Sequence, residues 1–322
     1  MPEVIALTGA TGFVGAELAK QLANTGHKIQ ALIRPASSRK RPADLAVKWI
    51  EGDLDDSDSL CRLVDGVSAV VHCAGAVRGA TREQFNRVNA DGLARLVLAA
   101  STQRPRPRFL LISSLAARES QLSHYASSKR LGEKLLIENS HGLPWTIYRP
   151  CAIYGPGDRE LLPVFEWMAK GIAPVLGSGN ARFSLLYVKD LAQAIDLWLN
   201  RHGCVSKTFE LHDGRSGGYS WHDVIDTVKR LRAKPVVSIK IPLVLVRLVS
   251  ASNLLLSRAF GYAPMLTPGK VRELSHSDWV CDNTALSSAT GWMPRIQLPE
   301  GLQITLEGAL TTKNQGVPND RI

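Results

Sequence analysis

The sequence predicts an α/β protein built on a doubly wound parallel sheet, with a smaller, mixed C-terminal domain. Apolar runs with the length of buried strands alternate with segments of helical period through the first half of the chain. A glycine-rich turn joins the first of these strands to the first helix. At 322 residues, 45% of them hydrophobic, the chain is long enough to bury a substantial core.

Six strands and four helices account for the alternation. The expected strands are 4–8, 28–33, 47–50, 69–73, 109–113 and 145–148. The expected helices are 16–25, 58–64, 82–101 and 125–139. Such βαβ units have right-handed crossovers, so the strands should run parallel and bind ligands beyond their carboxyl ends.

The turn after the first strand has the spacing of a phosphate-binding loop. Gly9 permits a sharp turn, Gly12 lets the backbone approach a pyrophosphate, and Gly15 lets the helix pack on the strand. The anion would lie on the unpaired amides at the helix start. We therefore expect a dinucleotide-binding (Rossmann) domain whose turn contributes Gly9, Thr11, Gly12, Phe13, Val14 and Gly15.

The end of the second strand favours NADP over NAD. NAD sites usually place an acid there, but residues 28–43 contain no Asp or Glu. Arg34 and Arg39 instead offer cations suited to a 2′-phosphate, although a solvated basic loop would look the same. Further cofactor contacts are expected where the third and fourth strands end, from Asp53, Leu54, Ala74 and Gly75.

A tyrosine and a lysine one turn apart open the helix expected at 125–139. Tyr125 and Lys129 therefore share one helix face. A phenol of ordinary pKa is a poor base near neutral pH, and the ammonium of Lys129 would favour its phenolate. Ser114, at the end of the fifth strand, would lie on the same side and hydrogen-bond a substrate oxygen; Ser113 is the alternative.

Together these motifs resemble the extended short-chain dehydrogenase/reductase superfamily, the epimerase/dehydratase-like proteins. The resemblance covers about residues 4 to 310 and includes the segment 149–158. It implies Tyr125 as general acid/base, Lys129 as its activator and a ribose ligand, and Ser114 as the group that polarises the carbonyl. It also places Asn89 and Pro150 beside the cofactor. A homodimer through 82–101 and 125–139 is a further implication.

Departures from the pattern argue against the nucleotide-sugar branch. Ser114 is followed by Leu115 and Ala116, where the dehydratases carry Thr-Asp-Glu, and 183–190 lacks the Arg-Asp-Tyr run of many epimerases. Only ten residues separate Ser114 from Tyr125, so the loop that usually covers the substrate is short. The general pattern is closer to the branch of 3β-hydroxysteroid dehydrogenase and dihydroflavonol reductase.

We therefore expect an NADP-dependent oxidoreductase that transfers hydride between nicotinamide and a ketone or secondary alcohol on a largely apolar small molecule. Two alternatives stay open. One is a nucleotide-sugar epimerase with bound NAD. The other is a non-catalytic assembly protein that holds NADPH, against which the intact set of Ser114, Tyr125 and Lys129 argues.

The domain organisation follows from the position of these motifs. Residues 1–150 should bind the cofactor and 151–310 should mainly bind substrate, with segments around 180–200 returning to the first domain. Residues 311–322 have the composition of a disordered tail.

Residues 241–260 predict an amphipathic helix with a wide apolar face. Ser250, Asn253 and Ser257 fall near one stripe, and Arg247 and Arg258 argue against a transmembrane span. A core helix, a lid over an apolar substrate, a helix lying in a membrane interface and a dimer contact remain open.

The charge and the cysteine content of the chain indicate which partners and which cellular compartment to expect. The net charge is +10, but the basic clusters at 34–48 and 104–108 lack interleaved aromatics, so we expect no nucleic acid. The five scattered cysteines match neither a disulfide framework nor zinc spacing, so we expect no metal and a reducing cytoplasm. Residues 1–3 have no features of a signal peptide.

Overall fold

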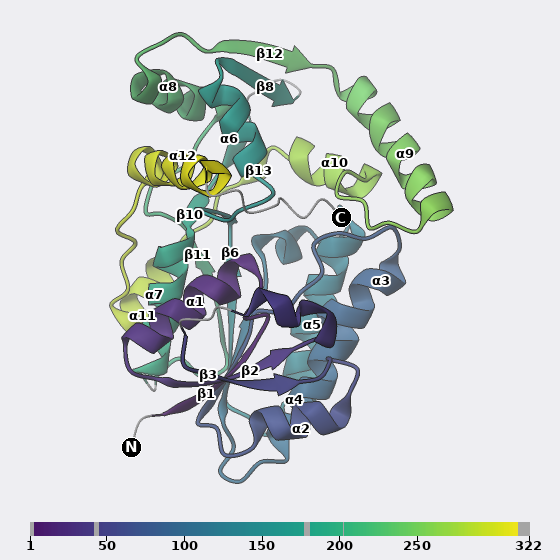
Figure 1. Ribbon diagram of the computed structural model, residues 1–322, viewed down its shortest axis with the longest axis vertical. Helices are drawn as coiled ribbons and strands as arrows, with labels where there is room; N and C mark the ends of the chain where they lie inside the picture. Colours follow the sequence, from purple (N-terminus) through teal and green to yellow (C-terminus); the bar gives the residue numbers. More distant parts are fainter. Residues whose placement is uncertain (1–2, 42–44, 177–180, 202, 315–322) are drawn as a thin grey trace.

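The computed structural model describes residues 3–41, 45–176, 181–201 and 203–314. Its centre is a seven-stranded parallel sheet in the order β11-β6-β5-β4-β1-β2-β3 (Figure 1). The strands are β1 (Val4–Thr8), β2 (Lys28–Ile33), β3 (Val47–Glu51), β4 (Ala69–His72), β5 (Arg108–Ile112), β6 (Trp145–Pro150) and β11 (Lys207–Leu211). The predicted fold class is confirmed. The predicted strand count was too low by one, because β11 joins the sheet from the second half of the chain.

Helices cover both faces of the sheet because its strands are apolar on both sides. One core holds Ile5 and Leu7 under α1 (Phe13–Asn24) and α7 (Val188–Leu199). Ala6, which points the other way, lies in a second core. The second face is covered by α2 (Ser57–Val64), α4 (Leu93–Ser101) and α5 (His124–Asn139), with α3 (Arg82–Asn86) beside α5. The helix predicted at 82–101 is interrupted by a π turn, Arg87–Gly92.

The strand order reverses between β1 and β4, and this reversal positions the site. The chain leaves β1 toward β2 on one side, whereas β4 leads to β5 on the other. The connections therefore diverge at the carboxyl ends of these two strands and leave the crevice in which doubly wound sheets bind ligands.

A second, smaller unit is built on short strand pairs and three helices (top of Figure 1). The pairs are β7 (Ala152–Tyr154) with β10 (Leu185–Tyr187), β8 (Ile172–Leu176) with β12 (Val237–Ile241), and β9 (Arg182–Phe183) with β13 (Asp278–Trp279). The helices are α6 (Leu162–Ala169), α8 (Trp221–Arg232) and α12 (Leu298–Asn314). They enclose a core that includes Tyr154, Phe165 and Leu302.

The chain crosses between the two units more than once. After the first strands of the smaller unit it returns through α7, which packs on α1, and β11, which pairs with β6. The short α11 (Thr284–Thr290) also contacts β11. At the end of the chain, α12 continues to Asn314, four residues into the predicted tail, and 315–322 lie outside the described residues.

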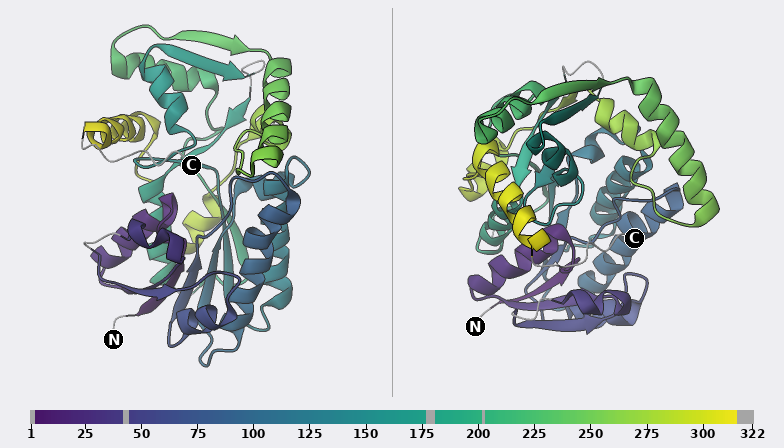
Figure 2. Two further views of the ribbon diagram at one scale, coloured as in Figure 1. Left: turned by 45° about the vertical axis from the view of Figure 1, so that its right-hand side comes forward. Right: turned by 45° about the horizontal axis from the view of Figure 1, so that its top comes forward.

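Two helices form the edge of the molecule beside the sheet's carboxyl end. The predicted helix at 241–260 is α9 (Leu243–Phe260), followed by α10 (Pro268–Ser275). α9 is the outermost element on its side in Figures 1 and 2. Only 17% of α9 is buried, so the interpretation as a core helix was wrong. The reason is orientation, because Ser250 and Ser257 face the protein while most of the leucines face outward.

Candidate active site

The turn between β1 and α1 is shaped by close backbone contacts. Gly9 has φ +75°, and a Cβ there would lie 2.7 Å from the amide nitrogen of Ala74. A Cβ on Gly15 would lie 2.1 Å from the carbonyl oxygen of Gly9. Among the described residues, no side chain caps α1 at Gly12, and its first turn holds no acid. The amides of that turn are thus available to an anion, which fits a dinucleotide pyrophosphate.

The other expected cofactor residues lie at the same edge of the sheet. Arg34 is exposed directly after β2, while Asp53 follows β3 and accepts a hydrogen bond from the Asp55 amide at 3.1 Å. Leu54 is buried. The side chain of Arg39 lies outside the described residues. The remaining members are half-buried or exposed in the first turn and after β4, or buried at the end of β6: Thr11, Phe13, Val14, Ala74, Gly75 and Pro150.

Asn89 fastens the loop after β4 to the helix that carries Tyr125. Its side chain is buried in the π turn, where the amide nitrogen donates to the Ala76 carbonyl at 3.0 Å and to the Ser128 hydroxyl at 2.9 Å. Its oxygen accepts from the Ala76 amide at 2.8 Å. The contacts of Asn89 thus position the residues around the crevice, and π turns are frequent at such sites.

The two serines after β5 have different partners. The Ser113 hydroxyl donates to buried Glu133 at 2.6 Å, and Glu133 also forms an ion pair with Arg149 at 2.6 Å. The half-buried Ser114 opens a 3-10 turn (η3, Leu115–Glu119), and its hydroxyl is hydrogen-bonded to the Tyr125 phenol. The geometry therefore favours Ser114 over Ser113 as the hydroxyl that faces the site.

Tyr125 lies at the start of α5, with its side chain beside Phe85, Ser114 and Lys270. Its ring packs edge-on against Phe85, with 6.2 Å between ring centres. Burial raises the pKa of Tyr125 above its ordinary value, and the hydrogen bond from Ser114 and the charge of Lys270 only partly oppose that shift. The phenol is thus neutral at neutral pH, which suits a proton donor.

Lys129 lies one turn further along α5, at the base of the site. Its buried Nζ donates to the Ile112 carbonyl at 2.8 Å, and burial lowers the pKa of Lys129 to about 8. A Cβ on Gly75 would lie 3.7 Å from this Nζ. The expected effect of Lys129 on the phenol differs from what the structure shows, since the cation that lowers the pKa of Tyr125 is Lys270.

Lys270 was absent from the predicted site, and α10 brings it there. Its Nζ lies 6.0 Å from the centre of the Tyr125 ring and pairs with Glu273 at 2.9 Å. Glu273 hydrogen-bonds the Ser123 hydroxyl, which caps α5 by accepting from the Ala126 amide at 2.9 Å. The helix start at Thr267 and the spacing of Lys270 and Glu273 are visible in the sequence, but nothing local indicates that α10 packs on α5.

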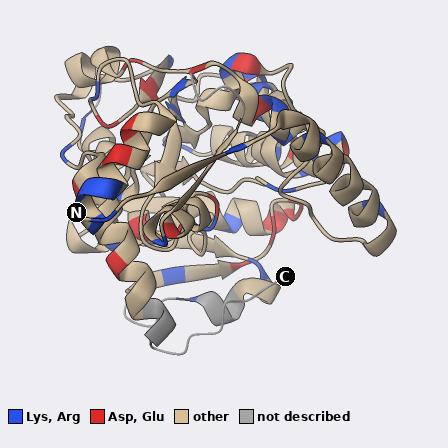
Figure 3. Cartoon of the chain, turned by 90° about the horizontal axis from the view of Figure 1, so that it is seen from above, with Lys and Arg blue, Asp and Glu red and all other residues tan. Residues whose placement is uncertain are grey.

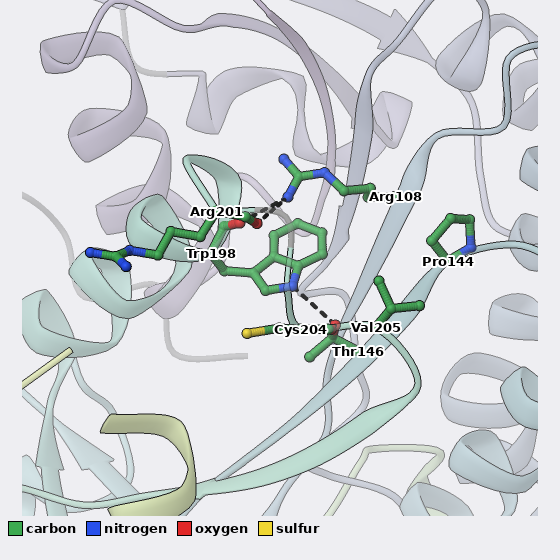
Figure 4. Close-up of a pocket in the computed structure, with 7 residues that line it drawn as sticks. All are labelled: Arg108, Pro144, Thr146, Trp198, Arg201, Cys204 and Val205. Carbon is green, nitrogen blue, oxygen red and sulfur yellow. Dashed lines mark hydrogen bonds between the residues drawn. The ribbon is translucent and has the colours of Figure 1, made fainter. Parts of the chain in front are cut away.

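The pocket in Figure 4 lies at the opposite end of the sheet, where β5 and β6 begin. The Arg108 guanidinium crosses it to the carbonyls of Trp198, at 2.9 Å, and Arg201, at 2.7 Å. Those bonds satisfy the last carbonyls of α7, and no room remains for a water molecule. The pocket is a packing feature remote from the crevice.

Comparison with known proteins places this geometry among nicotinamide-dependent enzymes. Residues 5–210 match the model of the NAD dependent epimerase/dehydratase family. A relative named ceramide reductase, from Caulobacter vibrioides, is 35% identical over 94% of this chain and 93% of its own. A 2-alkyl-3-oxoalkanoate reductase from Stenotrophomonas maltophilia is 29% identical over 59% of this chain and 63% of its own. A solved UDP-glucose 4-epimerase from Thermotoga maritima, 19% identical, superposes with a TM-score of 0.76 over 96% of this chain and 99% of its own, a likeness of fold.

Proposed function

The chain belongs to the NAD-dependent epimerase/dehydratase family, and we propose that within it the protein is an NADP-dependent reductase of ketones carried on largely apolar small molecules. The family membership makes it an oxidoreductase of the extended short-chain dehydrogenase/reductase type. The observation that carries the proposal is a neutral Tyr125 phenol, hydrogen-bonded to Ser114, at the crevice beside the first turn.

The proposed chemistry divides the work between cofactor and protein. A bound nicotinamide supplies or accepts the hydride. Tyr125 gives its proton to the carbonyl oxygen of the substrate, and Ser114 donates a hydrogen bond to the same oxygen. Lys270 supplies positive charge beside the phenol, which favours the phenolate left after the transfer, while the buried ammonium of Lys129 one turn along α5 would contact the ribose of the cofactor.

The proposal of NADP over NAD depends on the end of β2. Arg34 is exposed there, and no acid stands between Lys28 and Ala43. An arginine can bind a 2′-phosphate through two parallel hydrogen bonds, whereas an acid would be needed to favour a free ribose. The first turn, Asp53 and the residues after β4 would hold the rest of the cofactor.

The proposed substrate class is supported by the relatives and by the departures of the sequence. The two relatives are named as reductases, one of a ceramide and one of a 2-alkyl-3-oxoalkanoate, and the second name describes a ketone. Leu115 and Ala116 are both buried, and they stand where sugar-nucleotide dehydratases carry an acid and a base. A nucleotide-sugar epimerase with bound NAD is the alternative, since the fold is shared with a UDP-glucose 4-epimerase.

The test is cofactor consumption with defined substrates. We expect the purified chain to oxidise NADPH with a long-chain 3-oxo ester or 3-oxo amide in detergent, and Tyr125→Phe to lose that activity while binding NADPH normally. Conversion of UDP-glucose to UDP-galactose without added cofactor would replace the proposal by the epimerase. Undiminished cellular function of Tyr125→Phe would support a non-catalytic role and contradict it.

We also infer a homodimer through the outer face of α4 and α5. Leu98 is 57% exposed and Ile137 46%, and a hollow of about 390 Å³ lies on α5 beside Ile137. Exposed apolar side chains on neighbouring helices favour association. Sedimentation of Ile137→Asp should show a monomer.

The five cysteines are free thiols, which supports a reducing compartment such as the cytoplasm.

A further inference from the structure

Helix α9 has its apolar face on the outside. Only three of its residues, Val246, Ser250 and Ser257, are buried against the protein, and two of these are serines. The opposite side carries seven large apolar residues that are at least half exposed: Val244, Leu245, Leu248, Val249, Leu255, Leu256 and Phe260. A helix that packs on a protein core shows the reverse arrangement, with its leucines covered and its serines in water. This outward stripe, hereafter the α9 stripe, requires an apolar environment to cover it.

The segment of the chain that contains α9 carries charge of one sign. Residues 227–272 contain no Asp or Glu. They contain nine basic residues, which are Lys229, Arg230, Arg232, Lys234, Lys240, Arg247, Arg258, Lys270 and Arg272. Arg247 and Arg258 are exposed on α9 itself (right-hand edge of Figure 3), and within the described part of the chain neither forms an ion pair. The two cations on α9 itself therefore have no acid near them in the sequence.

We propose that α9 docks in the plane of an anionic membrane surface, with the α9 stripe in the acyl boundary and Arg247 and Arg258 at the phosphate headgroups. The combination of an apolar face, flanking arginines and no acid is that of an interfacial helix. A second copy of the chain would cover the stripe equally well, but it would bring a second set of these cations against the first.

α9 is tied to the protein just before its start and again in its second half, which favours a helix that lies on the membrane over one that crosses it. By length and hydropathy α9 passes as a membrane span, the one such helix in the described part of the chain. However, β12 immediately before it pairs with β8, and Asn253 in its second half donates to the Leu266 carbonyl at 2.9 Å. A crossing would break these contacts and bury Arg247 in hydrocarbon.

Docking through α9 also sets where a substrate would enter, a consequence that rests on the proposed function. The loop after α9 leads directly to α10, which places Lys270 beside the Tyr125 phenol. The amide of Gly79, in the loop after β4, bonds the Pro264 carbonyl at 3.3 Å, so the same segment borders the crevice. A membrane amphiphile could therefore pass from the bilayer to the site along this edge.

The binding test uses the full chain and vesicles of two compositions. The protein should sediment with phosphatidylglycerol/phosphatidylcholine vesicles and bind phosphatidylcholine alone more weakly. Leu248→Asp with Leu255→Asp should weaken binding by at least about tenfold per leucine. Arg247→Gln and Arg258→Gln should each weaken binding to the anionic vesicles by about fivefold. The matched control is Leu310→Asp, because Leu310 is 64% exposed on α12, far from α9 (Figure 1).

Several outcomes would overturn the proposal. The first is that the wild type stays in the supernatant with both kinds of vesicle. The second is that the α9 double variant binds the vesicles as tightly as the wild type does. A third is an α9 double variant that changes the oligomeric state while Ile137→Asp does not, which would assign the stripe to a second copy. Circular dichroism and thermal melting of each variant verify that a loss of binding is not a loss of fold.

Activity separates this proposal from the proposed function. The α9 double variant should lose turnover of a long-chain 3-oxo ester embedded in vesicles, and keep turnover of a short, water-soluble 3-oxo ester. If the α9 double variant keeps turnover of both esters, the proposed entry route is overturned. If the wild type reduces neither ester, the proposed function fails, and the vesicle binding still decides the docking.

Discussion

The Nζ of Lys270 lies 6.0 Å from the centre of the Tyr125 ring, although the two residues are 145 positions apart in the chain. Lys270 is held there by Glu273, whose carboxylate also bonds the cap residue of the helix that carries Tyr125. One ion pair therefore couples the α9–α10 edge of the molecule to the proton donor. We expect Lys270 to act through the phenol, because its charge lowers the pKa of Tyr125 against the effect of burial.

Replacement of Lys270 should change the pH dependence of the reaction. In Lys270→Met the pKa of Tyr125 should rise further, so alcohol oxidation, which needs the phenolate, should require a higher pH. We expect the rate of alcohol oxidation near neutral pH to fall about tenfold in Lys270→Met, and to recover in part in Lys270→Arg. The control is Lys134→Met, a lysine on α5 whose side chain is 68% exposed. An unchanged pH profile in Lys270→Met would exclude an effect through the phenol.

The serines after β5 should separate stability from catalysis. Ser114→Ala should lower activity by about a hundredfold, because it removes a hydrogen bond to the substrate oxygen, and should lower the free energy of unfolding by only about 1 kcal/mol, through loss of the cap on the Ala116 amide. Ser113→Ala should do the reverse and destabilise the fold by about 1.5 to 3 kcal/mol, since it removes a donor to buried, charged Glu133. Urea unfolding and NADPH turnover of both variants show which serine supports the fold and which supports catalysis. The opposite pattern would assign the catalytic hydroxyl to Ser113.

The fold could be predicted wherever a strand is buried on both faces. β1, β2 and β4 lie in the middle of the sheet and are mostly apolar, so their positions were found to within a residue. β11 was missed because it lies beyond the βαβ alternation of the first half of the chain, and because Lys207 and Thr208 are exposed, so that it has no apolar run. The π turn around Asn89 was also missed, since the helical period continues through it.

The site could be predicted only where its residues are close in sequence or sit at strand ends. The glycine turn and the spacing of Tyr125 and Lys129 are local patterns, and they lie as expected at the carboxyl edge of the sheet. The contacts that distinguish Ser113 from Ser114, and Lys270 from Lys129, depend on the packing of Glu133 and α10. The two faces of α9 were predicted, but which one faces outward is decided by packing that the sequence pattern does not contain.

Removal of the arginine after β2 should change the cofactor preference. Arg34→Ala should weaken NADP binding by about tenfold or more, because a charge-assisted hydrogen bond to the 2′-phosphate is lost, and should leave NAD binding unchanged. Thermal-shift titration with the two cofactors measures this. Lys20→Ala, an exposed cation on α1, is the control for charge alone. Equal shifts from NADP and NAD in the wild type would remove the proposed preference.

Acid should destabilise the protein through His72, which is buried at the end of β4 and hydrogen-bonded to the Thr8 hydroxyl at 2.8 Å. Burial and the charge of Lys129 lower the pKa of His72 from 6.5 to about 3. Between these values the unfolded chain binds a proton that the folded chain does not, so stability is full above about pH 6.5 and falls by about 1.4 kcal/mol per pH unit below it. Urea unfolding from about pH 7 to about pH 5 should show this loss in the wild type and not in His72→Asn. His222→Asn, whose side chain is 80% exposed, should keep the wild-type slope. An equal slope in wild type and His72→Asn would mean that the imidazole at the β1–β4 switch point is already charged in the folded protein, and that the crevice is more polar than its packing indicates.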